Sequence, residues 1–277
     1  MPTKFLSRSQ VDHFNDHGFL QPVRVLSESE ARSVRDELEQ FEADFPEHRN
    51  KLDLKANLIL PFVDRLTRLP QVLDLMEDLL GSDLLLWSAE FRIKEANAGQ
   101  YAAWHQDTAY ITHKPFLAIG LLALSRASIQ SGCLRVIPDS HKGPLLSHSD
   151  GDDRKSILTR AQYIDEAFDD STAVDLELAP GELTVFNSAL IHSSGPNHSD
   201  DRRIGVLMSY LPTSATKEGS RDTAILVRGE DCFGHFDLES GPVSDNPLEN
   251  VEHQRRSIEA VTASMFAGSA HQVKGLQ

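Results

Sequence analysis

The chain has 277 residues, of which 40% are hydrophobic and 25% charged, so it can bury a large core and is not a disordered protein. Its formal net charge of -15 argues against nucleic acid or an anionic membrane surface as the main partner, which leaves small molecules. Cys133 and Cys232 are too few for a disulfide framework and lack the CxxC spacing of a zinc site.

The N-terminal third is predicted to be helical. Residues 1–8 lack the apolar stretch of a signal peptide and no later run is long enough to span a bilayer, which predicts a cytoplasmic protein. Apolar residues recur at helical spacing between Ser7 and a stop at Gly18, and the capping-box pattern of residues 27–30 opens a second amphipathic helix. A third helix is expected over 70–80, with proline first and glycine just past its end.

From residue 82 onward the pattern changes to short apolar runs separated by turn residues. These runs cover 84–93, 101–108, 116–124, 133–137, 174–178, 183–186, 190–192 and 204–210. Their spacing predicts a sandwich, jelly roll or barrel and not repeated βαβ units. The remaining segments are predicted to be an exposed loop at 147–154, a short helix at 158–168 and a terminal helix at 248–266. We expect a single domain with a helical part (1–81), a β core (about 82–212) and a C-terminal extension (213–277).

A histidine and a carboxylate, His105 and Asp107, close the apolar run 101–108. Alternate side chains of a strand share a face, so both would point into one space while Gln106 turns away. His192, also at the end of an apolar run, is the best source of a third ligand. Two imidazoles and one carboxylate leave open positions on an ion, which is the arrangement of non-haem Fe(II) oxygenases. The rival histidines are His113, His141, His148 and His198.

Three motifs occur in one order: Trp104-His105-Gln106-Asp107, then residues 131–142, then residues 192–197 followed by Arg203. In order and spacing they resemble the phytanoyl-CoA dioxygenase family over most of residues 14–212. The resemblance implies a mainly β protein, a double-stranded β-helix (jelly roll, cupin-like) with flanking helices. It also implies Fe(II), 2-oxoglutarate and O2, and oxidation of an unactivated C–H bond with release of succinate and CO2. Asp139 departs from the family pattern, which usually has glycine there, but it is not a proposed ligand.

The far carboxylate of 2-oxoglutarate needs an anchor, and Arg203 lies 11 residues after His192 on the next predicted strand. Arg202 is a direct competitor. Alternation places the two arginines on opposite faces, and the family spacing selects Arg203. Ser194 and Thr108 are neighbours of the ligands and could supply hydroxyl groups to the same co-substrate, or could cap local backbone instead.

Arg92 and Lys94 share one strand face and, with Trp104, are the predicted substrate contacts. If that face looks inward, the two cations could hold a carboxylate or phosphonate; a solvated rim is the alternative. The position of Asp107 is a small residue in related halogenases, so we expect hydroxylation of a small anionic or zwitterionic metabolite. Other readings are an acyl-CoA hydroxylase of the same family, a Zn2+ hydrolase without need of Arg203, and a non-catalytic cupin-like metal- or ligand-binding protein. The oligomeric state is not predicted.

Overall fold

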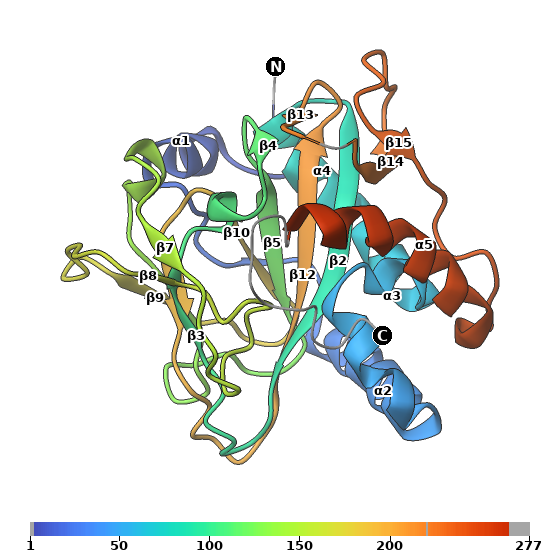
Figure 1. Cartoon of the computed structure of the whole chain (residues 1–277), viewed down its shortest axis with the longest axis horizontal. Helices are drawn as coiled ribbons and strands as arrows, with labels where there is room; N and C mark the ends of the chain where they lie inside the picture. The colour runs from blue at the N-terminus through green and yellow to red at the C-terminus, as the bar shows by residue number, and fades with distance from the viewer. Residues whose placement is uncertain (1–2, 220, 266–277) are drawn as a thin grey trace.

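The computed structural model describes residues 3–219 and 221–265. Two β-sheets form the core, and helices cover the outer face of the larger one (Figure 1). The α-helices are α1 (Arg8–His17), α2 (Glu28–Asp44), α3 (Pro61–Thr67), α4 (Pro70–Leu80) and α5 (Pro247–Met265). The 3-10 helices are η1 (Pro46–Asp53), η2 (Ala56–Leu58), η3 (Asp107–Ala109) and η4 (Ser140–Lys142).

Over the described residues the larger sheet has seven strands, in the order β1 (Val23–Arg24), β10 (Glu182–Asn187), β5 (Ala118–Ala123), β12 (Arg203–Pro212), β2 (Leu84–Lys94), β14 (Thr223–Arg228) and β15 (Asp237–Leu238). The smaller sheet has the order β3 (Ala102–His105), β11 (His192–Ser194), β6 (Leu134–Val136) and β9 (Val174–Leu176). Two further pairs are β13 (Thr216–Lys217) with β4 (His113–Lys114), and β7 (His148–Ser149) with β8 (Tyr163–Ile164). This is the predicted jelly-roll architecture, with helices at both ends of the chain.

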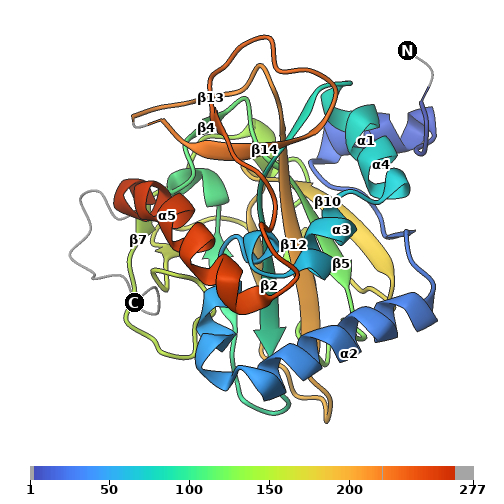
Figure 2. The ribbon, with the colours of Figure 1, turned by 90° about the vertical axis from the view of Figure 1, so that its right-hand side faces the viewer.

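The two faces of the larger sheet bury different sets of apolar side chains. Its outer face packs against α1 to α4, with Phe14 and Met76 from the helices meeting Phe91 and Val206 from the strands. Figure 2 shows these helices lying across the sheet. Its inner face turns toward the smaller sheet. Because both faces are covered, the central strands read as continuous apolar runs in the sequence.

The predicted helices begin where their capping residues place them. Ser7 and Ser27 each accept a hydrogen bond from the third helical residue, whose own side chain accepts from the backbone of the capping serine. α1 ends at Gly18, which has a φ of 81°. α5 confirms the predicted terminal helix as far as residue 265; Phe266 lies outside the described residues.

The short helix predicted over 158–168 is wrong. Ala161 has a φ of 47°, a left-handed conformation that cannot continue a helix, and its N–H donates to the Leu158 carbonyl in a tight turn. The next residues, Tyr163 and Ile164, form β8 and pair with β7 inside the predicted loop 147–154. The apolar residues at helical spacing therefore did not indicate a helix here, since part of this segment forms a two-stranded antiparallel pair.

The larger sheet also takes strands from outside the predicted core range. β1 precedes residue 82 and pairs with β10, while β14 follows residue 212 and pairs with β2. These flanking segments are thus part of the same sheet as the central strands β5, β12 and β2. Over residues 3–219 and 221–265, no helix is both long enough and apolar enough to cross a bilayer.

Candidate metal centre

His105, Asp107 and His192 converge between the two sheets. β3 and β11 are neighbours in a register that sets His192 opposite His105, and their ring centroids are 4.1 Å apart. β3 ends at His105, so Asp107 reaches in from η3, with its carboxylate 3.4 Å from His105 Nε2 and 3.7 Å from His192 Nε2. All three ligand atoms lie within 4.8 Å of one another. This arrangement can hold one metal ion.

Backbone carbonyls orient the two imidazoles. His105 Nδ1 donates to the Ala103 carbonyl at 2.8 Å and His192 Nδ1 donates to the Leu190 carbonyl at 2.9 Å, a tautomer assigned from these partners. Each Nε2 therefore presents a lone pair toward Asp107, as a metal ligand must. Burial lowers the pKa of His192 to about 4, which keeps this imidazole neutral.

The charge state of Asp107 also suits a cation. Burial acts to raise the pKa of this carboxyl, but the neighbouring imidazoles of His192 and His105, together with Arg92, hold the pKa below its usual value. An ionised carboxylate beside neutral imidazole is the protonation state in which these groups bind metal.

Gln106 turns away from the ligands and fastens the segments behind them. Its amide donates to the Ala189 carbonyl at 2.8 Å and its carbonyl accepts from Leu146 N at 2.9 Å. Its own backbone N–H donates to His148 Nε2 at 2.9 Å, which gives this rival histidine a structural role. Both ligand-bearing segments are thereby tied to one buried amide.

The other rival histidines lie elsewhere. His113 Nε2 is 3.3 Å from a carboxylate oxygen of Asp222, and His141 lies 3.3 Å from the Asn15 carbonyl. His198 sits in the loop after β11. Within the described part of the chain, His105, Asp107 and His192 form the one group of three such side chains close enough to share an ion.

Arg203 and Arg202 point to opposite sides of β12, as alternation predicts. Arg202 lies outside the cavity and is paired with Glu42 and Glu95. Arg203 is 4% exposed and lines the cavity. One of its terminal nitrogens donates to the Arg92 carbonyl at 3.4 Å, while its Nε is buried without a partner. Burial lowers the pKa of Arg203 to about 10, so this guanidinium is charged, and no carboxylate within residues 3–219 and 221–265 is its counter-ion.

Lys94 lies behind the cavity wall and does not line it, contrary to the prediction that it contacts substrate. It is directly opposite Arg203 in the register of β2 and β12. Its Nζ donates to Ser194 Oγ at 2.7 Å, and Ser194 itself lines the cavity. The serine hydroxyl is therefore within the site, and the lysine is within reach only of that hydroxyl and of backbone carbonyls.

Two further predicted contacts also lie away from the cavity. Trp104 faces the opposite side of β3 from His105 and packs edge-on against Phe168, with the Arg135 guanidinium 5.8 Å from its ring. Thr108 belongs to η3, where its backbone N–H donates to the Ser188 carbonyl at 3.2 Å. Neither side chain lines the cavity, so neither is placed to meet a ligand there.

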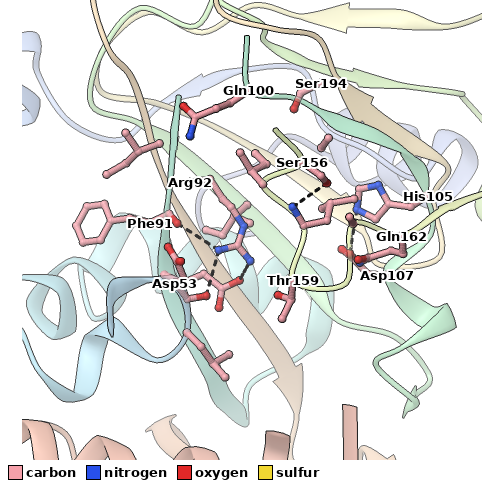
Figure 3. Close-up of a pocket in the computed structure, with 18 of the residues that line it drawn as sticks. Asp53, Phe91, Arg92, Gln100, His105, Asp107, Ser156, Thr159, Gln162 and Ser194 are labelled. Carbon is pink, nitrogen blue, oxygen red and sulfur yellow. Dashed lines mark hydrogen bonds and ion pairs between the residues drawn. The ribbon is translucent and has the colours of Figure 1, made fainter. Parts of the chain in front are cut away.

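Arg92 points into the cavity, as predicted for a substrate contact, and acidic residues lie beside it. Figure 3 shows Arg92 and Asp53 on one side of the cavity and His105 and Asp107 on the other. The Arg92 guanidinium is 2.6 Å from a carboxylate oxygen of Glu90 and donates to the Asp53 carbonyl at 3.1 Å. Sequence reasoning missed Glu90, although an acidic residue two positions before Arg92 in an apolar strand signalled a shared inward face.

The cavity has a volume of about 740 Å3. Its deep part is apolar, formed by Trp87, Ile119, Leu121, Phe186 and Leu207, and the metal-ligand group lies along one wall. Its mouth is polar and includes the loop of residues 151–162, which no sequence signal connected with the site. Such a volume and lining are those of a small-molecule pocket.

Comparison with known proteins adds to this geometry. The profile of the family described as "Phytanoyl-CoA dioxygenase (PhyH)" matches residues 14–205. The chain is 31% identical over 163 residues to the "Probable alpha-ketoglutarate-dependent hypophosphite dioxygenase" of Stutzerimonas stutzeri, covering 57% of this chain and 56% of that protein. It is 25% identical over 253 residues to the "Methylphosphonate hydroxylase" of Gimesia maris, covering 85% of this chain and 91% of that protein.

A solved structure described as "non-heme monooxygenase; ThoJ apo" superposes with a TM-score of 0.83 at 28% identity. The superposition covers 93% of this chain and 98% of the other. By contrast, the chain spans only about half the length of several curated relatives that it matches. The match therefore covers nearly the whole chain for this structure and for the Gimesia maris protein, and about half the length of those other relatives.

Proposed function

This chain belongs to the phytanoyl-CoA dioxygenase family, and we propose that it is an Fe(II)- and 2-oxoglutarate-dependent hydroxylase of a small anionic or zwitterionic metabolite. When bound, Fe(II), 2-oxoglutarate and O2 supply the oxidation of a C–H bond, with release of succinate and CO2. The proposal treats residues 1–277 as one dioxygenase domain. Its site residues divide into a metal-holding group (His105, Asp107 and His192), a co-substrate anchor (Arg203) and a substrate wall (Arg92 with the acidic residues Glu90 and Asp53).

His105, Asp107 and His192 would hold the metal from one side. Their donor set of two imidazole nitrogens and one carboxylate oxygen is the one that non-haem Fe(II) oxygenases use, with the remaining positions left to other ligands. Asp107 occupies the position that is small in the halogenases this family resembles. A carboxylate there supports hydroxylation over halogenation.

The observation that carries the proposal is the unpaired guanidinium of Arg203. It is buried, faces the same cavity as the metal-ligand group, and has a buried Nε to which no residue in the described part of the chain hydrogen-bonds. A planar carboxylate offers two oxygens to such a fork, so the far carboxylate of 2-oxoglutarate fits it. A Zn2+ hydrolase would have no use for this buried cation.

The substrate wall supports a small and preferably zwitterionic substrate. The Arg92 guanidinium lies beside the Glu90 carboxylate and the backbone carbonyl of Asp53 at the cavity, so an anionic group can meet the guanidinium while an ammonium group meets the acidic side chains there. Two relatives are named for hypophosphite and methylphosphonate, both small phosphorus oxyanions. A long acyl-CoA is less suited, because the net charge of -15 gives the protein little general attraction for its phosphates.

The test is anaerobic reconstitution with Fe(II), followed by 2-oxoglutarate and O2 with and without a library of small carboxylates, phosphonates and amino acids. We expect succinate in step with a hydroxylated product for one class of compound. Release of product without O2 would instead indicate a hydrolase, and binding without succinate a cupin-like binding protein. Arg92→Ala should raise KM for the active compound and leave KM for 2-oxoglutarate unchanged; an unchanged substrate KM would remove Arg92 from the substrate wall.

A further inference from the structure

Lys94 and Arg203 are two buried basic side chains that lie side by side, and no described carboxylate pairs with either of them. They face each other in the register of β2 and β12, and Lys94 has no measurable exposure. Among the described residues, no carboxylate forms an ion pair with either one. Burying an uncompensated charge is costly, so this pair is built for an anion or for a change of protonation.

Three oxygens surround the Lys94 amine. They are Ser194 Oγ at 2.7 Å, the Gly195 carbonyl and the Gly132 carbonyl at 3.3 Å. Gly132 has a φ of 74°, and a Cβ there would lie 2.1 Å from the Gly195 carbonyl oxygen and 3.0 Å from the lysine nitrogen. The backbone at this point therefore has to be glycine for the cradle around the amine to form.

The number of hydrogens on this amine decides the direction of the Ser194 hydroxyl. An ammonium has three N–H donors, one for each oxygen, so Ser194 Oγ accepts and its own hydrogen must point into the cavity. A neutral amine has two donors, which the two carbonyls can take, and a lone pair that accepts the serine hydrogen. Only the first arrangement offers a hydroxyl donor to a ligand beside Arg203.

We propose that Lys94 is a positioning residue, which takes a proton from solvent when a carboxylate binds at Arg203 and so turns the Ser194 hydroxyl toward that carboxylate. This inference rests on the proposed function, because the carboxylate is the far one of 2-oxoglutarate. One N–H bond forms on the amine while the bond to that proton breaks in the solvent or buffer acid that supplies it, and the lysine gains one positive charge as the ligand brings one negative charge into the site.

The electrostatics of the empty site agree with this linkage. Burial, and next the charge of Arg203 on β12, lower the pKa of Lys94 to about 6, and the thiol of Cys133 just before β6 opposes them weakly. Lys94 is thus mainly neutral above pH 7 in the empty site. A carboxylate beside Arg203 offsets the repulsion and raises the lysine pKa, so ligand binding at neutral pH draws in a proton.

The experiment is calorimetric titration of the full chain, loaded with Mn(II) under anaerobic conditions, in buffers of different ionisation enthalpy. The ligands are 2-oxoglutarate and 2-oxopentanoate, in which a methyl group replaces the far carboxylate. At pH 7.5 we expect wild type to take up more protons with 2-oxoglutarate than with 2-oxopentanoate, by an amount approaching one per site. The difference should shrink as the pH falls below 6, since Lys94 is then protonated before the ligand arrives.

Lys94→Met should abolish this difference and weaken 2-oxoglutarate binding by about tenfold, with little effect on 2-oxopentanoate. Ser194→Ala should weaken 2-oxoglutarate similarly, and Lys94→Met added to it should cost less than it does in wild type. Lys217→Met is the matched control, because this mostly buried lysine pairs with Asp222 away from Ser194.

Equal proton uptake by wild type and Lys94→Met overturns the inference. So does a Lys94→Met variant that binds 2-oxoglutarate and 2-oxopentanoate more weakly by the same factor. If Lys94→Met and Ser194→Ala weaken 2-oxoglutarate binding additively, the inference is also overturned. If Lys94→Met folds poorly, Ser194→Ala alone still tests whether the serine hydroxyl contributes to 2-oxoglutarate binding. A wild type that binds both acids equally well refutes the proposed function itself, which is a different result.

Discussion

Replacing Arg203 with methionine separates function from stability. The side chain is buried with an unpartnered Nε, so a ligand carboxylate meets a fully desolvated guanidinium. Truncating one member of such a pair costs about 2–5 kcal/mol, and about 3 kcal/mol corresponds to roughly 150-fold in Kd. In the ligand-free protein the substitution should have the opposite effect on the free energy of unfolding, because an unpaired buried cation opposes folding. Arg203→Met should therefore be at least as stable as wild type while binding 2-oxoglutarate about 150-fold more weakly.

Arg202→Met is the matched control, at the residue just before β12. Its guanidinium binds Glu42 and Glu95 and lies outside the cavity, so its loss leaves the mostly buried Glu42 with a weaker partner. We expect a loss of about 1–2 kcal/mol in the free energy of unfolding and no change in 2-oxoglutarate affinity. Urea unfolding of the metal-free proteins and calorimetric titration of the Mn(II)-loaded proteins measure the two effects.

The reasoning fails if Arg203→Met retains wild-type affinity for 2-oxoglutarate. It also fails if the two variants lose stability to the same extent, since Arg203 would then be a structural residue like its neighbour.

Three other predictions concern the ligands and their support. Asp107→Ala removes one of the three proposed metal ligands and should reduce hydroxylated product by at least about 100-fold; full activity in a product assay would contradict its role as a ligand. Gln106→Ala leaves two backbone groups unpaired and should lower the free energy of unfolding in urea by about 2–4 kcal/mol, whereas the exposed Gln130→Ala should change little; similar values would argue against the fastening role. Asp222 is buried, which acts to raise its pKa, but His113 and Lys217 hold the pKa well below its usual range. The contribution of this carboxylate to stability is therefore present above about pH 4 and is lost as the pH falls. Asp222→Asn should therefore cost about 3 kcal/mol at pH 7 and flatten the acid side of the stability curve, and an unchanged curve would refute this.

The ligand group could be predicted because strand alternation and chain order carry much of its geometry. His105 and Asp107 were expected on one strand face, yet β3 ends at His105 and a 3-10 turn brings Asp107 in. The side chains still converge because the turn preserves the direction of the second residue. Alternation placed Arg203 and Arg202 on opposite faces, and the family spacing selected Arg203, which begins β12.

The substrate wall was harder to predict because a side chain that points to the inner face of a sheet does not necessarily line the cavity. Arg92 and Lys94 share a face, but β11 stands in front of Lys94, and only the pairing of strands distant in sequence reveals this. Trp104 was predicted to contact substrate, but neighbouring strand residues point to opposite faces, and its ring lies on the face away from His105.

Local pattern also failed where tertiary pairing decides the structure. Residues 158–168 have apolar positions at helical spacing, but the left-handed turn at Ala161 and the pairing of β8 with β7 override them. The loop 151–162 lines the cavity mouth without any motif, because its place is set by the strands it connects. Contacts of this kind carry little sequence signal over short range.

The most direct test of the central claim is anomalous diffraction at the iron edge from anaerobic crystals grown with Fe(II) and 2-oxoglutarate. The account predicts one iron peak bounded by His105, Asp107 and His192, with the far carboxylate of 2-oxoglutarate against Arg203. An iron peak elsewhere, or a co-substrate whose far carboxylate lies away from Arg203, would contradict it.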